Sequence, residues 1–130
     1  MKRDFVLPEE DREFLDSLGL VWETVASVEN WVVIHDYPIP AGYTIPKVRV
    51  GLKIEPAYPQ TQIDMVYFLP ALVRSDGKVI KALSEHAFNG EQWQRWSRHR
   101  TAQNPWRPGV DNIEMHIALV NHWLKRELVQ

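Results

Sequence analysis

Cysteine is absent from all 130 residues of this sequence. Without a thiol the chain can form no disulfide, build no thiolate metal site and offer no cysteine nucleophile. An excess of positive charge is also missing, because 15 Lys and Arg residues face 17 Asp and Glu residues, giving a net charge of −2. That balance argues against nucleic acid or an anionic membrane surface as a partner.

Long apolar segments are missing as well. No stretch approaches the roughly 20 apolar residues that a transmembrane helix needs. The segment Met1–Pro8 has a basic start but lacks the apolar core of a signal peptide. These absences fit a cytoplasmic protein that makes no use of a membrane. With 45% hydrophobic residues in 130, the chain is expected to fold as one domain over residues 1–130.

Helix signals occur near both ends of the chain. Pro8 suits a first helical turn, acidic residues follow it, and Gly19 suits the residue after a helix, so residues 8–18 are predicted to be helical. A second helix is predicted over residues 111–127. There Asp111 is the expected cap, and apolar side chains follow at helical spacing.

Four strands are predicted between these helices. Residues 47–55 alternate apolar and mostly charged side chains, as a half-buried antiparallel strand does. Residues 71–110 are expected to be mostly irregular, with at most a short strand over 79–83, and long loops of this kind tend to be functional. The order predicts an α+β fold in which helices pack on one side or end of a four-stranded antiparallel meander. The other three strand segments are rich in β-branched and aromatic residues and cover 21–27, 31–37 and 64–69.

Trp93–Gly109 is the most unusual segment of the irregular region. Its 17 residues hold three tryptophans and four arginines together with Ser97 and His99. A core segment would carry less charge, and a solvated loop would carry fewer indoles. The composition therefore indicates a binding surface, a reactive site, or both.

The order of elements and two motifs resemble the ubiquitin-conjugating (UBC) fold. Tyr58-Pro59 resembles the Tyr-Pro turn between the third and fourth strands of that fold. Trp106-Arg107-Pro108 resembles the Trp-x-Pro that follows the catalytic cysteine in that family, and counting back from it places Ser97 at the position of the cysteine. Asn89 falls where the family's His-Pro-Asn motif carries its asparagine, although the two residues before it differ from the motif.

A bacterial branch of this superfamily is the closer resemblance. Its members are small UBC-like proteins found beside a ThiF-type adenylating (activating) enzyme, a ubiquitin-like protein and a deconjugating protease. The Trp-Gln-Arg-Trp-Ser-Arg-His segment and the Trp-Arg-Pro-Gly-x-Asp segment look like that group, and the resemblance spans about residues 8–128. It implies conjugation of a ubiquitin-like protein to a lysine of a target protein, with serine in place of the catalytic cysteine and with no cofactor.

Ser97 has three interpretations. It could be a nucleophile that accepts the ubiquitin-like C-terminus as an oxyester, which requires a base and an oxyanion stabiliser. It could be inert, in which case the protein is a catalytically inactive UBC-like binding module that scaffolds the ubiquitin-like protein and the activating enzyme. It could also replace a natural cysteine in order to trap a complex.

The nucleophile interpretation assigns roles to neighbouring polar residues. His99 and His86 are candidate bases, and Asp111 could orient a base or the target lysine as well as cap the last helix. Arginines, backbone N–H groups and Asn89 could stabilise the oxyanion. The expected catalytic residues are Ser97, His99, Asn89 and Asp111.

The expected partner-binding side chains are aromatic or basic, because Trp and Arg are enriched at interface hot spots. Of the tryptophans, Trp93 is expected to be the more exposed, and the other two are also expected to wall the site. His116 and His122 lie six residues apart on different helix faces without a suitable carboxylate, so no metal site is expected. The partner-binding residues are Trp93, Arg95, Trp96, Arg98 and Trp106.

Overall fold

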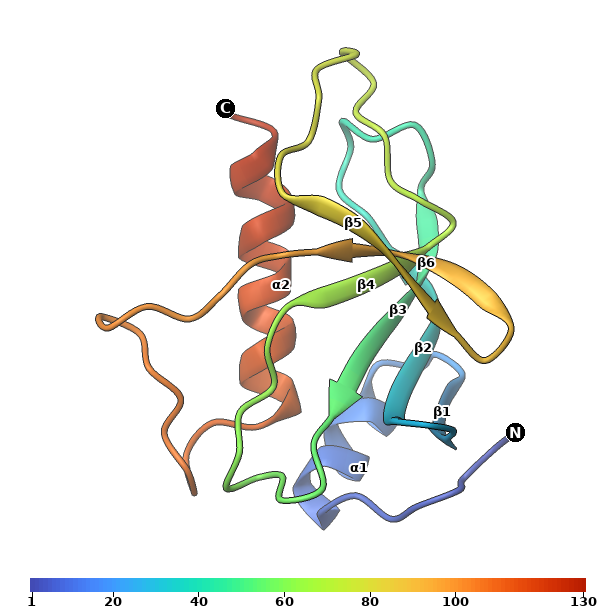
Figure 1. Ribbon diagram of the computed structural model, residues 1–130, viewed down its shortest axis with the longest axis vertical. Helices are drawn as coiled ribbons and strands as arrows, with labels where there is room; N and C mark the ends of the chain where they lie inside the picture. The colour runs from blue at the N-terminus through green and yellow to red at the C-terminus, as the bar shows by residue number, and fades with distance from the viewer.

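The computed structural model describes residues 1–130 as an α+β fold with two helices and one six-stranded sheet (Figure 1). This confirms the α+β class and both predicted helices, but the sheet has six strands where four were predicted. Neither α-helix qualifies as a membrane span. In chain order the elements are α1 (Glu9–Ser17), β1 (Trp22–Ala26), β2 (Asn30–Pro38), β3 (Lys47–Ile54), β4 (Val66–Leu69), β5 (Leu83–Phe88), β6 (Glu91–Trp96) and α2 (Ile113–Glu127).

The sheet contains the predicted meander and two strands beyond it. The strand order is β1-β2-β3-β4-β6-β5, and every neighbouring pair is antiparallel. The prediction of a mostly irregular segment over 71–110 was wrong, because β5 and β6 form a hairpin within it. The short strand suggested over 79–83 is absent, since β5 begins at Leu83. The hairpin turns at Asn89-Gly90, whose φ angles of 50° and 80° suit a type I′ turn.

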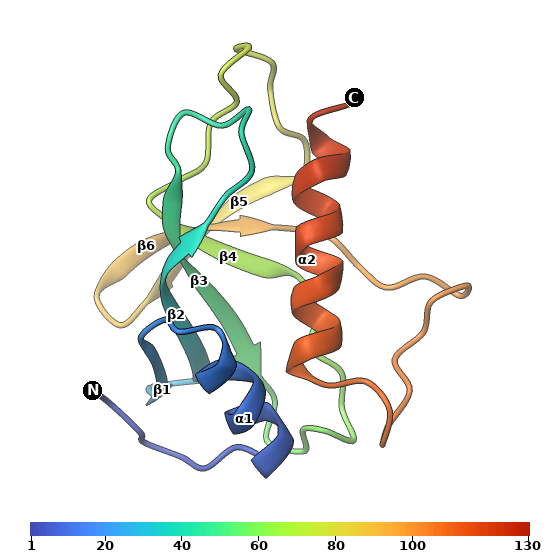
Figure 2. The same cartoon turned by 180° about the vertical axis from the view of Figure 1, so that it is seen from behind.

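The larger hydrophobic core lies between one sheet face and the two helices. Figures 1 and 2 show α2 lying along one side of the sheet and α1 near one end of the sheet. Trp96 at the end of β6 is fully buried in this core and packs edge-on against Phe68 of β4, with ring centroids 5.3 Å apart. The cap of α2 is Asn112 rather than the predicted Asp111, because the Asn112 side chain accepts the Met115 N–H at 3.0 Å.

The opposite sheet face carries a second, aromatic core cluster. Phe88 of β5 stacks on Trp31 of β2 with centroids 4.3 Å apart, although three strands separate β2 from β5 in the sheet. The hairpin must therefore curl over this face. A Cβ on Gly51 of β3 would lie only 3.3 Å from the Trp93 ring, so glycine leaves room for the curl. Trp93 is 2% exposed and does not present the exposed indole expected of it.

Candidate functional site

Ser97 lies where the chain leaves the end of β6. Its N–H donates to the Ala82 carbonyl at 3.0 Å, which places it beside the residue that precedes β5. On the other side, the Met65 N–H donates to the Arg98 carbonyl at 3.2 Å. Ala82 and Met65 have φ angles of 57° and 59°, in the left-handed region that costs a non-glycine residue about 1–2 kcal/mol. Two residues in strained backbone conformations thus flank Ser97.

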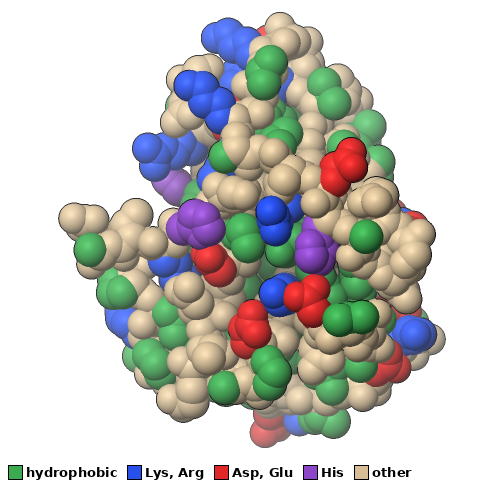
Figure 3. Space-filling view, in the orientation of Figure 1, with side chains coloured by type: hydrophobic (Ala, Val, Ile, Leu, Met, Phe, Trp, Pro, Cys, Tyr) green, Lys and Arg blue, Asp and Glu red, His purple; other side chains and the backbone are tan.

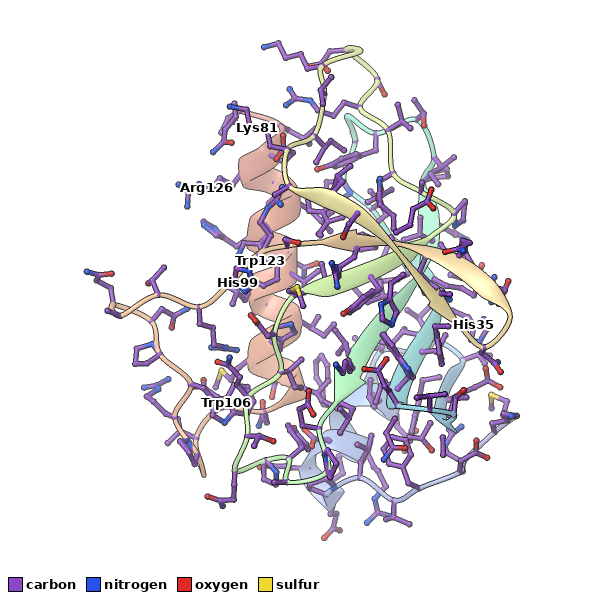
Figure 4. The ribbon with its side chains drawn as sticks, in the orientation of Figure 1. His35, Lys81, His99, Trp106, Trp123 and Arg126 are labelled. Atoms are coloured by element: carbon purple, nitrogen blue, oxygen red, sulfur yellow. The ribbon has the colours of Figure 1, made fainter.

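An open groove of about 330 Å³ begins at Ser97 and follows the C-terminal half of α2. Figure 4 labels four of its lining residues, which lie on the same side of the molecule beside α2: Lys81, His99, Trp123 and Arg126. Figure 3 shows Lys and Arg side chains gathered over the same region. The groove is therefore electropositive, which favours an anionic group or acidic surface. Its lining residues are Lys81, Ala82, Ser97, Arg98, His99, Trp123, Arg126, Glu127 and Gln130.

His99 is oriented by a carboxylate that the sequence analysis did not identify. Its Nδ1 lies 2.8 Å from Oδ2 of Asp64, just before β4. Because an ionised carboxylate only accepts hydrogen bonds, Nδ1 carries the proton, and in the neutral ring Nε2 is left as an acceptor. The imidazole is mostly exposed, whereas Oδ1 of Asp64 is buried without a partner. Asp64 thus fixes the tautomer that a general base requires.

Arg98 forms a fixed cationic wall of the groove. Its guanidinium donates to the Lys81 carbonyl at 3.0 Å and to Oε1 of Glu127 at 3.0 Å. Glu127 is buried, and its other oxygen lies 3.4 Å from the buried guanidinium of Arg74. One carboxylate therefore holds two arginines, and only Arg98 borders the groove beside Ser97.

A buried polar cluster holds the loop of residues 97–112 against the body. The Arg100 side chain is 5% exposed, stacks over the Trp106 ring and donates to Nδ1 of His116 at 3.3 Å. His116 is fully buried, and its Nε2–H donates to the Met65 carbonyl at 2.8 Å. Burial, aided by the nearby guanidinium, lowers the pKa of His116 to about 4, so the ring is neutral at pH 7. Burial also lowers the pKa of Arg100.

Asp111 and Trp106 serve the same loop. Burial raises the pKa of the Asp111 carboxyl, but hydrogen bonds from Arg107 and the charge of Arg100 outweigh it, and the net pKa is lowered. Its Oδ2 accepts the Arg107 N–H at 2.7 Å, so this carboxylate organises the loop, and it is not among the residues that line the groove at Ser97. The half-buried Trp106 donates Nε1–H to the Pro59 carbonyl at 2.9 Å. The two segments that resemble UBC motifs are therefore in direct contact.

Asn89 and His86 do not belong to this site. Asn89 occupies the hairpin turn, and the six residue pairs of the β5–β6 ladder separate it from the Ser97 end. Its expected place beside Ser97 was wrong, because Asn89-Gly90 forms the turn at the far end of the hairpin. His86 packs near Trp31 on the aromatic face, with Nε2 3.1 Å from Oε1 of Glu29.

Arg95 and the two tryptophans of β6 are also removed from the groove. Arg95 donates Nε–H to the Ser84 hydroxyl at 2.8 Å. Trp93 and Trp96 are buried in the two cores on opposite sheet faces. Of the residues expected at the site, the structure brings Ser97, Arg98 and His99 to one groove.

Comparison with known proteins gives one family. Residues 7–127 match the model of the family described as prokaryotic E2 family E. Searches of curated proteins and of solved structures found no match. Because the family match spans nearly the whole chain, this protein belongs to prokaryotic E2 family E, and its function is related to ubiquitin-like conjugation.

Proposed function

We propose that this protein is a conjugating enzyme that accepts the C-terminus of a ubiquitin-like protein from a ThiF-type activating enzyme. The acyl group is held as an oxyester on Ser97 and is then transferred to a lysine amine of a target protein. One observation carries the proposal: Ser97 and His99 line the same open groove, and Asp64 holds the imidazole by Nδ1. Family membership supports the reaction class.

The loading step is an acyl transfer between two nucleophiles. His99 Nε2 takes the Ser97 hydroxyl proton as Oγ attacks the carbonyl carbon of the thioester on the activating enzyme. A C–O bond forms, the C–S bond breaks, and the leaving thiolate is neutralised by the proton from His99. Arg98, fixed by Glu127, supplies positive charge where the oxyanion develops.

The transfer step reverses the roles at the serine. The lysine amine attacks the oxyester, loses a proton to His99 and forms an amide, while the Ser97 oxygen leaves and regains a proton from the imidazole. An oxyester reacts more slowly with amines than a thioester does. Orientation of the base by Asp64 and the fixed charge of Arg98 must therefore supply more of the rate than the leaving group.

A second function is favoured by one observation. The Ser97 hydroxyl makes no hydrogen bond to His99 in this structure, whereas His99 is paired with Asp64. A catalytically inactive binding module that scaffolds the ubiquitin-like protein and the activating enzyme would need no such bond. Catalytic hydrogen bonds often form only when substrate is bound, so an assay of covalent adducts separates the two functions.

The deciding experiment is reconstitution with the ubiquitin-like protein, the activating enzyme and ATP, followed by intact mass spectrometry. We expect an adduct on Ser97 that survives thiol reductant but is cleaved by hydroxylamine. Ser97→Ala should abolish the adduct and keep binding, whereas Ser97→Cys should give a thiol-sensitive one. His99→Ala should slow loading by about 10²- to 10⁴-fold, and the exposed His122→Ala is the matched control. If the activating enzyme carries the ubiquitin-like protein as a thioester but no adduct forms on Ser97, the protein is a binding module and not a conjugating enzyme.

A further inference from the structure

The two edges of the sheet differ in how they are covered. At the β1 edge the N-terminal segment pairs with Thr24. The Thr24 N–H donates to the Lys2 carbonyl at 3.1 Å, and the Thr24 carbonyl accepts the Asp4 N–H at 3.0 Å. β5 forms the other edge and pairs only with β6. Uncovered edges are templates for the addition of another strand, and proteins commonly block the edges they do not use. The uncovered edge strand, β5, begins beside the Ala82–Ser97 contact.

The register of the hairpin identifies the free backbone groups. In a hairpin with a two-residue turn, the pair that closes the turn, here Phe88 and Glu91, is hydrogen-bonded, and bonded pairs then alternate along the ladder. The bond from Ser97 N–H to the Ala82 carbonyl fits this alternation. The intervening residues of β5 direct their N–H and C=O groups outward. These residues are Leu83, Glu85 and Ala87, and all three are exposed.

We infer that this edge binds the extended C-terminal tail of the ubiquitin-like protein, which adds to the sheet as a strand antiparallel to β5. The inference rests on the proposed function, because a conjugating enzyme must hold such a tail with its carboxyl end at the nucleophile. β5 runs from Leu83, beside the Ala82–Ser97 contact, to Phe88 beside the turn. An antiparallel tail therefore ends near Ser97, and a parallel tail would end at the wrong end of the hairpin.

The surroundings of the edge suit an extended peptide. A groove of about 330 Å³ flanks it and is partly apolar, with Leu83 37% exposed. Such a groove can accept alternate side chains of an added strand, while main-chain hydrogen bonds hold its backbone. At the Ser97 end, Lys81, Arg98 and Arg126 place positive charge beside the carboxyl terminus. The groove at the edge is lined by Ala71, Leu83, Ser84, Glu85, Gln92, Trp93 and Gln94.

Amide hydrogen exchange tests this docking without any chemical step. The probe is the intact ubiquitin-like protein, added in saturating amounts to the Ser97→Ala variant. We expect the outward amides of Leu83, Glu85 and Ala87 to exchange at least tenfold more slowly when it is bound. Unchanged exchange at saturation overturns the inference. Protection that rises with protein concentration in the absence of the partner assigns the edge to a second copy and also overturns it.

Proline substitution tests the backbone contact in the loading reaction. Glu85→Pro removes an outward N–H and leaves the β6 ladder intact, as an edge position permits, and Glu85→Ala removes only the side chain. We expect Glu85→Pro to slow loading at least tenfold and Glu85→Ala to have little effect. Loading at the wild-type rate in a folded Glu85→Pro protein overturns the docking and leaves the proposed function intact. Amide protection without any covalent adduct supports the docking and refutes the proposed oxyester on Ser97.

The direction of the tail has its own readout. The probe is a synthetic peptide of the last eight residues of the ubiquitin-like protein, with a nitroxide at its N-terminus. An antiparallel strand places the label near the turn, so the Asn89 and Gly90 amide signals should broaden while that of Ala82 stays sharp. The reverse pattern overturns the inference, because the tail would then end at the wrong end of β5.

Discussion

Acidification should destabilise the fold through one buried imidazole, that of His116. This ring is fully buried, donates to the Met65 carbonyl and accepts a hydrogen bond from Arg100. A protonated ring would hold a second cation next to that guanidinium, away from water. Burial and the guanidinium charge together lower its pKa from 6.5 to about 4. The native state therefore resists a proton that the unfolded chain accepts readily.

The size and the pH window of the effect follow from these two pKa values. Between pH 6.5 and pH 4 the unfolded chain binds more protons than the native state, so stability falls as pH falls. At 1.36 kcal/mol per pKa unit, the loss is about 2 kcal/mol by pH 5 and about 3 kcal/mol by pH 4. Above pH 7 the contribution is fully present. Carboxylates whose pKa values are lowered in the native state begin to lose their contribution below about pH 5.

Urea denaturation followed by tryptophan fluorescence at pH 7, 6, 5 and 4 measures this loss. The matched variant is His116→Gln, whose amide can donate to the Met65 carbonyl but does not titrate. Subtracting its pH dependence from that of the wild type removes the effects of the other histidines and the carboxylates. The expected difference is a wild-type loss about 2 kcal/mol larger between pH 7 and pH 5. Parallel pH profiles would refute the assignment of a buried neutral ring to His116.

Two further substitutions probe the framework of the site. Phe88→Ala removes the ring that stacks on Trp31 and should lower the free energy of unfolding by about 3–5 kcal/mol. The near-ultraviolet circular dichroism signal should be lost as well. A change under about 1 kcal/mol would mean that the hairpin does not curl over the sheet. Arg74→Met removes the donor to the Glu127 carbonyl at 2.6 Å and leaves that residue's buried carboxylate short of a partner. Urea titration should show a loss of about 3–5 kcal/mol, and a fully stable variant would contradict the role of Arg74 at the end of α2.

The helices and the first four strands were predictable because each has a local signal. Alternation over 47–55 and the apolar stripe after residue 112 reflect burial of a single face. The β5–β6 hairpin also has a local signal, the Asn89-Gly90 pair. That signal is ambiguous because Asn89 also falls where the UBC family carries its asparagine. The side chains of Leu83–Phe88 and Glu91–Trp96 do not alternate between apolar and polar, since both sheet faces are partly covered.

The site was predictable only where its residues are neighbours in the chain. Ser97, Arg98 and His99 share a groove in part because they are consecutive. Asp64 joins them through the pairing of Val66 with Trp96, which brings the residues before β4 beside those after β6. No spacing rule links positions 35 residues apart, because such a contact depends on strand register and not on local pattern.

The approach of Trp93 to Gly51 has a consequence for the evolution of the family. A Cβ at position 51 would meet both that ring and Tyr67, so the volumes at positions 51 and 93 are constrained together. Family members should therefore covary at these two positions: a side chain at 51 should accompany a smaller residue at 93, and a tryptophan at 93 should accompany glycine at 51. Because the pair governs how far the hairpin curls, lineages that exchange it should also differ in the path of β5, the edge strand that begins beside the Ala82–Ser97 contact.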